Sequence, residues 1–362
     1  MTSLPDAGPP IAPGETARDR LLAVVLVAIP VILLACIIFV LKHDTPIWGD
    51  GARVINERLP PTLRTLLRPF HQHLNAVPIA LWAILPTSAA KLAALLVSHV
   101  VLSTATTAVL VARVGRTVGV ALGLPLGLLG TAHFDLLMPW QILFSLALIF
   151  GLVATMASLP RHRTWTLRIL VAGSVAIATG TSNIGLFVGL ALGLWFVIER
   201  RWTQLLELAP TAVLWVMWFL IVGRHGLKRE GLDLTLAVVP YTIAVVSNGV
   251  GAVAGVGWFG GLLIIGAVIA YVVVRRGITV PPPLIAFPVA LFLMYAALRV
   301  VRGEVLGNGL QARYIYMTGF LLAFGLAAGA PRLPQTRWWL IASLYATLAN
   351  LGVLARVFPT YP

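Results

Sequence analysis

The sequence has little charge and few acidic residues. Only 10% of its 362 residues are charged while 59% are hydrophobic, and 12 Asp and Glu stand against 26 Lys and Arg. A soluble core could not hide this much apolar surface, which excludes a soluble globular protein. Apolar runs of roughly 17 to 22 residues, the length of a helix that crosses a bilayer, recur between short basic segments. No alternating pattern typical of membrane β-barrels is present, so the sequence predicts an all-α polytopic membrane protein.

Cysteine is nearly absent as well. The single residue, Cys36, lies inside the first apolar run, so the chain has no disulfide framework. The net charge of +14 comes from arginines scattered among short connections and not from one basic domain. We therefore expect no nucleic-acid partner, because lipid headgroups or a phosphorylated substrate explain the basic residues better.

The apolar runs predict about 11 transmembrane helices, within a range of about 10 to 13. The predicted spans are 21–41, 89–112, 117–133, 141–158, 168–182, 184–198, 204–222, 257–274, 284–301, 314–330 and 338–357. Residues 1–20 are rich in Pro, Gly and charge and lack the features of a signal peptide. We expect them to form a disordered cytoplasmic tail, followed by a single transmembrane domain over 21–362. The pieces 77–87 and 235–254 are apolar but interrupted, which indicates re-entrant or interfacial helices.

Short connections with clustered basic residues indicate the orientation. Arg18 and Arg20 fall on the same side as the segments ARVGR, PRHRTWTLR, ERRW, VRRG and PRLPQTR. By the positive-inside rule that side is cytoplasmic, and it includes the N-terminus. The outer loops are then 42–88, 223–240 and 302–313, which combine carboxylates with basic residues. We expect a multi-pass protein of the cell membrane whose active site is extracytoplasmic.

Asp50 stands between two glycines shortly after the first span, in the segment PIWGDGARV. Glycines allow the backbone to turn sharply and to approach a ligand closely. A carboxylate at the bilayer edge could act as a general base or hold a divalent ion. The alternative is an Asp-Gly turn that caps the following helix. The residues alone leave both interpretations open.

The segment RPFHQHLNAVP contains His71, His73 and Asn75. Two histidines at this spacing face the same side only in an extended segment, and no third ligand follows at a defined spacing. We therefore predict no metal site here. Hydrogen bonds from the three side chains to a sugar or phosphate are expected, with capping of a helix near Pro78 as the alternative.

Asp135 lies in the short outer connection AHFDLLMPWQILF. If the helices on either side pack next to the first span, Asp135 and Asp50 would be two carboxylates around one cleft. The alternative makes Asp135 a solvated turn residue and Trp140 an ordinary interfacial anchor.

Arg313 directly precedes a span, beside Tyr314 and Tyr316. A guanidinium can bind a phosphate there through paired hydrogen bonds, and snorkelling to the headgroups is the alternative. The basic loop VGRHGLKREGLDL adds Arg224 and Lys228, which suit a phosphate or lipid headgroups equally.

The landmarks of the sequence are, in order, an acidic first outer loop and the segments PFHQHLNAVPIALW, LMPWQILFSLALIFG, TSNIGLFVGLAL and QARYIYMTGFLL. In this order the chain resembles the GT-C superfamily of polytopic glycosyltransferases, in particular a branch found in actinobacteria. The resemblance covers nearly the whole chain from about residue 21. It implies a GT-C-like fold, in which long helices surround a cleft that opens to the outer leaflet.

The resemblance also implies a polyprenyl-phosphate sugar donor, an envelope glycan, lipid or protein acceptor, surrounding membrane lipids and no nucleotide. Carried onto this chain, the general base of an inverting transfer would be Asp50, with Asp44 as the second candidate. Asp135 matches an acidic group that some members use with a metal, and Arg313 corresponds to a basic residue near the donor phosphate. Many relatives have adjacent acidic residues in the first loop, whereas glycines flank Asp50 here, so a divalent metal cofactor stays an open question.

Two other functions remain open at this point. A transporter or flippase of a lipid-linked or small solute would require charged groups at mid-bilayer and two related halves. The sequence has few such groups and no clear internal repeat. His99 is the main exception, and a histidine in such a place is more often hydrogen-bonded in the core than part of a relay. A protein that binds a lipid-linked sugar without turning it over is the third possibility.

Overall fold

The computed structural model describes residues 16–47, 50–69, 74–226, 235–274, 279–302, 312–331 and 333–360, and all regular structure in these ranges is helical. Within these ranges, seven helices are long and apolar enough to cross a membrane. They are α1 (Ala17–Lys42), α5 (Ser88–Arg113), α8 (Ile142–Ala157) with the preceding turn η2 (Pro139–Gln141), α11 (Trp202–Ile221), α13 (Gly257–Val274), α14 (Pro282–Arg302) and α16 (Arg337–Val357). The chain is therefore an all-helical protein of the membrane type.

Five further apolar helices are not among these seven candidates. They are α6 (Arg116–Gly127), α9 (Trp165–Thr181), α10 (Asn183–Ile198), α12 (Thr235–Ala254) and α15 (Ala312–Gly329). Each of the eleven predicted spans thus contains a helix. The first begins earlier than predicted, at Ala17, because Thr16 and Asp19 form a reciprocal capping box at its start. Most of the predicted tail, residues 1–15, lies outside the described residues.

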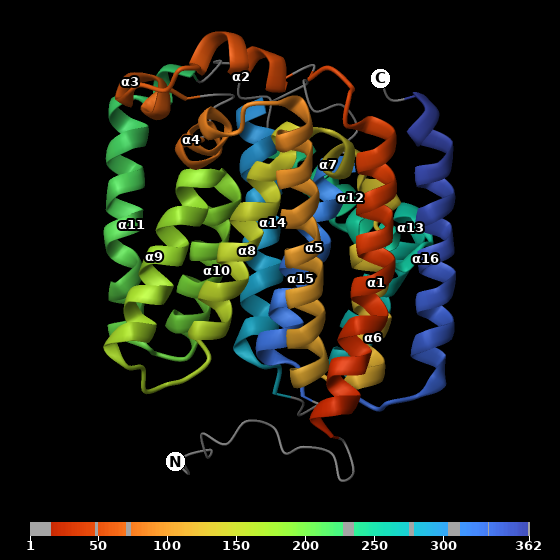
Figure 1. The fold of residues 1–362 in the computed structure, drawn as a ribbon. Helices are drawn as coiled ribbons and strands as arrows, with labels where there is room; N and C mark the ends of the chain where they lie inside the picture. Colours follow the sequence, from red (N-terminus) through yellow and green to blue (C-terminus); the bar gives the residue numbers. More distant parts are fainter. Residues whose placement is uncertain are drawn as a thin grey trace.

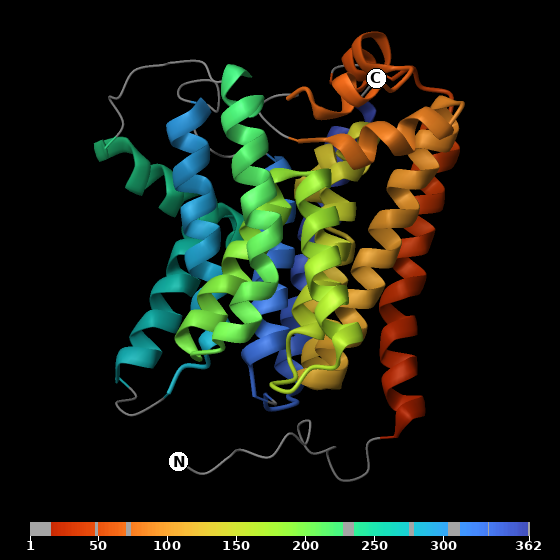
Figure 2. The same ribbon diagram turned by 90° about the vertical axis from the view of Figure 1, so that its left-hand side faces the viewer.

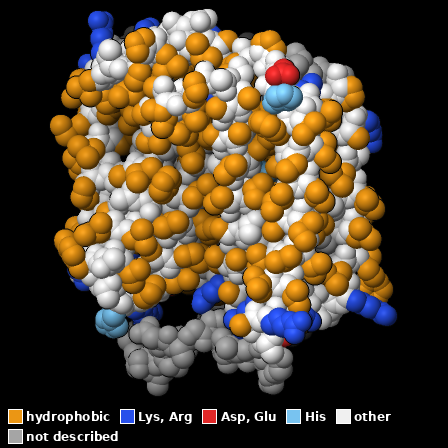
Figure 3. All heavy atoms as spheres, in the orientation of Figure 1, with side chains coloured by type: hydrophobic (Ala, Val, Ile, Leu, Met, Phe, Trp, Pro, Cys, Tyr) orange, Lys and Arg blue, Asp and Glu red, His pale blue; other side chains and the backbone are white. Residues whose placement is uncertain are grey.

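The helices form one bundle, and three small helices lie across one of its ends (Figure 1). These are α2 (Asp50–Arg58), α3 (Leu63–Leu67) and α4 (Ala76–Ile84), and we call this end of the bundle the cap end. The start of α1 lies at the opposite end. Figure 3 shows hydrophobic side chains over the band between the two ends, with most of the Lys and Arg of that face near the opposite end. This distribution fits a bilayer around the bundle.

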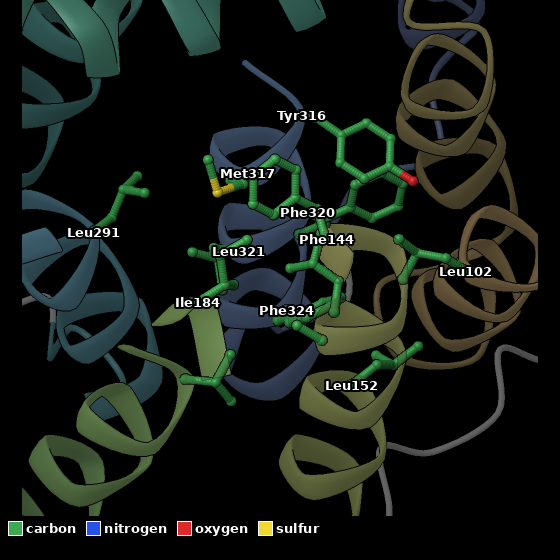
Figure 4. Close-up of a cluster of buried hydrophobic side chains, with 14 of the residues drawn as sticks. Leu102, Phe144, Leu152, Ile184, Leu291, Tyr316, Met317, Phe320, Leu321 and Phe324 are labelled. Carbon is green, nitrogen blue, oxygen red and sulfur yellow. The ribbon is translucent and has the colours of Figure 1, made fainter. Parts of the chain in front are cut away.

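Helix α15 lies at the centre of the bundle. Its aromatic residues Tyr316, Phe320 and Phe324 are fully buried. Figure 4 shows them among side chains from α5, α8, α10 and α14. A helix that is apolar on all sides needs such neighbours around its whole circumference. Helix α15 also packs on the turn η1 (Gly130–Ala132) and on α7 (His133–Leu137).

Helices α12 and α13 pack through small residues and diverge from their junction (Figure 2). A side chain on Gly251 would collide with the backbone of Gly257, and one on Gly261 with the carbonyl of Ser247. This Ser-xxx-Gly to Gly-xxx-Gly contact is a mode of close helix packing typical of membranes. The range 235–254, predicted as re-entrant or interfacial, is a 20-residue helix packed against α14 and α15.

Asn350 of α16 ties three elements together in the interior. Its Oδ1 accepts from the backbone N–H of Thr131 at 3.2 Å and from its hydroxyl at 2.8 Å, and its Nδ2 donates to the carbonyls of Ala252 at 2.8 Å and Ala346 at 2.9 Å. Every hydrogen-bonding position of the buried amide is thereby used. Thr131 lies in the turn η1 (Gly130–Ala132), so α16 fixes the connection that leads to Asp135.

A buried ion pair at the opposite end joins the connection between α8 and α9 to helix α11. The guanidinium of Arg163, whose side chain is 1% exposed, lies 3.0 Å from a carboxylate oxygen of Glu207, whose side chain is 12% exposed. The ring of Phe196 lies 5.2 Å from the same guanidinium. Burial lowers the pKa of Arg163, while the charge of Glu207 acts against this shift. The pair fixes the connection between α8 and α9 onto α11.

Candidate functional site

The cap folds onto the bundle through one face of α2. Gly51, Val54 and Arg58 recur at helical spacing and are buried, whereas Arg53 and Glu57 face solvent as a 3.5 Å ion pair. The guanidinium of Arg58 donates to the carbonyls of Thr65, Arg68 and Pro69, at 3.3, 3.2 and 2.9 Å. Burial, followed by the positive charge of Arg68, lowers the pKa of Arg58. Arg58 therefore holds the end of α3 against α2, although its residue type would also suit a phosphate.

The start of α2 lies on Trp82, the first of two tryptophans that meet edge to face. Asp50 is the first residue of α2, and a Cβ added to the next residue, Gly51, would lie 2.9 Å from the ring of Trp82. Gly51 is thus needed for the close approach of α2 to this ring. Trp82 in turn meets Trp140 edge to face, with ring centroids 5.0 Å apart. Trp140 is 3% exposed and belongs to the core, so the prediction that it could be an interfacial anchor is wrong.

Asp135 is part of α7 (His133–Leu137), a short helix between α6 and α8 that packs on η2, the turn that contains Trp140. It is completely buried, which excludes a solvated turn residue. The tyrosines Tyr295 and Tyr316 lie within electrostatic range of its carboxylate. Of the two interpretations, the solvated turn is therefore wrong, while a cleft shared by Asp135 and Asp50 stays a prediction.

A directional chain of hydrogen bonds runs through the interior beside it. His99 Nε2 lies 2.9 Å from the carbonyl of Gly127, which can only accept, so Nε2 carries the proton. In the neutral imidazole Nδ1 then accepts from the Tyr316 hydroxyl at 2.9 Å, which leaves the tyrosine oxygen to accept from Ser145 at 3.2 Å. Gly127 is the last residue of α6, so His99 satisfies a carbonyl at the end of that helix.

The predicted site residues lie on elements that pack in series at the cap end. Helix α2, which begins at Asp50, packs on η2, and α7, which carries Asp135, packs on both η2 and α15. Arg313 is the second residue of α15. The structure thus brings together the three elements that carry these residues, although the side chains of Asp50 and Arg313 are not among those described.

The other predicted site residues have different surroundings. Asn75 is buried at the start of α4, and with its amide nitrogen turned inward it donates to the carbonyl of Thr181 at 3.1 Å. The hydroxyl of Tyr316 is buried and engaged with His99 and Ser145, so it could donate to a ligand only by giving up its hydrogen bond to His99. Arg224 is exposed in η3 (Gly223–Gly226). His71, His73 and Lys228 lie outside the described residues.

None of the protein-family models, curated proteins and solved structures compared with the chain matches it. Among the described residues, no three His, Cys, Asp or Glu side chains cluster as a metal site would require. The geometry of the cap end is therefore the basis for any functional conclusion.

Sequence reasoning missed two polar residues of this region. Lys91 in the first turn of α5 is 5% exposed, and its ammonium group lies 5.6 Å from the centroid of Trp82. Gln141 of η2 is 3% exposed, and its Oε1 has no hydrogen-bond partner among the described residues. A lysine inside an otherwise apolar helix was the available signal for the first. Gln141 looks in the sequence like any polar residue next to a span, and only the packing of the helices shows that it is buried.

Proposed function

We propose that the chain is a GT-C-like membrane glycosyltransferase with about 11 membrane-crossing helices. It would transfer a sugar from a polyprenyl-phosphate donor to an extracytoplasmic acceptor. The observation that carries the proposal is the packing of α2 on η2 and of α7 on η2 and α15. Elements far apart in the chain, which bear the acidic and basic residues expected for this chemistry, converge at one end of the bundle.

The proposed reaction forms a bond between the acceptor oxygen and the anomeric carbon of the sugar while the bond from that carbon to the donor phosphate breaks. Asp50 takes the proton of the acceptor hydroxyl, which makes the oxygen a better nucleophile. Arg313, with Arg224 or Lys228, stabilises the charge that develops on the leaving phosphate. Asp135 is buried and would support this surface from the bundle side.

Transport of a lipid-linked or small solute is the second candidate function. The observation in its favour is the buried chain of Ser145, Tyr316 and His99, since polar residues inside a membrane bundle often line a pathway. Both nitrogens of His99 already have fixed partners, however, and one of these partners is a helix-terminal carbonyl. A structural role explains this chain without a moving proton, and we therefore place the transferase first.

Reconstitution separates the two functions. Purified protein in phosphatidylcholine liposomes would receive polyprenyl-phosphate sugars labelled in the sugar, together with an envelope glycan fraction as the acceptor. The transferase proposal expects the label to move from the lipid phase into the glycan. If the label crosses the bilayer while it stays lipid-linked, and none reaches the glycan, transport is the function and the transferase proposal fails.

A further inference from the structure

Lys91 is a buried cation in an unfavourable position. It is 5% exposed and lies in the first turn of α5, a helix that begins after the cap residue Thr87. Removal of an ammonium group from water costs free energy unless an anion compensates it. The N-terminal end of a helix carries a partial positive charge, which disfavours a cation further. Something must offset both costs.

The described surroundings of Lys91 compensate its charge only in part. The ammonium donates one hydrogen bond, to the carbonyl of Leu85 at the end of α4, and it faces the ring of Trp82. No carboxylate among the described side chains is paired with it. An ammonium group has three donors, so the described side chains leave two of them for a ligand.

The position of Lys91 connects it with the acidic turn. The indole of Trp82 that faces the ammonium is the same ring on which Gly51 rests. An anion bound by Lys91 would therefore be separated from the backbone next to Asp50 mainly by the indole of Trp82. Arg58, another buried cation at the cap end, donates to three backbone carbonyls and does not compete for this anion.

We propose that Lys91 binds the phosphate group of a membrane lipid at the cap end, between α4 and the N-terminus of α5. Lysine binds phosphate as a compact point charge, and the apolar helices next to the site suit a ligand with a lipid tail. The inference rests on the proposed function in one respect: if the chain is a transferase, the bound phosphate is that of the polyprenyl-phosphate donor. The phosphate of an ordinary anionic phospholipid has the same chemistry, and the experiment distinguishes the two sources.

The test measures thermal unfolding of the full chain in phosphatidylcholine nanodiscs, alone, with undecaprenyl phosphate and with phosphatidylglycerol. Undecaprenyl phosphate should raise the unfolding midpoint of the wild type. Lys91→Met should weaken its binding by roughly 10- to 100-fold, the effect of one charged hydrogen bond, and so remove the rise. Lys91→Gln keeps a donor for the carbonyl of Leu85 without the charge, and it should also lose the rise. Lys42→Met, which removes the lysine at the end of α1, is the matched control and should keep the rise.

The outcomes separate the site from the reaction. A full rise that survives both Lys91 variants overturns the phosphate site. An equal rise with phosphatidylglycerol, lost in the same variants, supports the site but assigns it to ordinary lipid and removes the donor from it. Lys91-dependent binding of undecaprenyl phosphate without sugar transfer supports the site and contradicts the proposed transferase.

Discussion

Asp50→Asn is expected to lower the rate of sugar transfer by about 10²- to 10⁴-fold, the usual contribution of a general base. An amide cannot take the proton of the acceptor hydroxyl, although it keeps the shape of the side chain. The unfolding free energy should fall by less than about 1 kcal/mol, because a carboxylate in the first turn of a helix contributes no more than that. The measurement is the initial rate of label transfer in liposomes, together with thermal unfolding of the same preparation.

Asp44→Asn is the matched control for this prediction. The side chain of Asp44 is 91% exposed beyond the end of α1, and its carboxylate lies 3.2 Å from the imidazole of His43. Its replacement should leave the transfer rate unchanged. If the Asp50 variant transfers sugar as fast as the wild type, Asp50 is only a helix-capping residue. Loss of activity in the Asp44 variant alone would move the base to Asp44.

Glu207→Gln is expected to destabilise the protein by about 3 to 5 kcal/mol, because it leaves the buried guanidinium of Arg163 without its counter-charge. Arg168 lies 3.8 Å from the same carboxylate and loses a second, more exposed contact. Denaturant unfolding of the protein in detergent measures the change. The rate of sugar transfer per folded molecule should remain that of the wild type, since the pair lies at the opposite end from the cap.

The control for the ion pair is Glu57→Gln on the surface of α2. Its partner, Arg53, is 57% exposed, and such pairs contribute about 0 to 1 kcal/mol. A double variant, Arg163→Met with Glu207→Leu, should recover most of the lost stability because neither charge then stays buried alone. Equal small effects of the Glu207 and Glu57 variants would show that the buried pair contributes no more than a surface pair.

The sequence predicted the helices well where apolar composition determines them. Each of the eleven expected spans contains a helix, because a run that is apolar on all sides can satisfy its backbone in a membrane only by helix formation. The helices α2 and α3 were hidden within a predicted outer loop. Their residues are mixed in polarity, and they become helical on a surface that the rest of the bundle provides.

The candidate site was predictable in part. The order of landmarks along the chain pointed to Asp50, Asp135 and Arg313, and their elements pack in series at the cap end. The positions of Trp82 and Lys91 depend instead on how α4 and α5 meet, which no local pattern encodes. Arg58 shows the opposite error. As an arginine in an outer segment it suggests a phosphate ligand, but its guanidinium binds backbone carbonyls.

Extracytoplasmic sugar transfer requires the cap end to lie outside the cytoplasm, and cysteine labelling in intact cells tests this directly. The only native cysteine is replaced by Cys36→Ala, and single cysteines are introduced by Arg53→Cys in α2 or by Arg161→Cys at the opposite end, both at exposed positions. We predict that a membrane-impermeant maleimide labels position 53 in intact cells and position 161 only after permeabilisation. The reverse pattern would place the acidic turn in the cytosol and contradict an extracytoplasmic transferase.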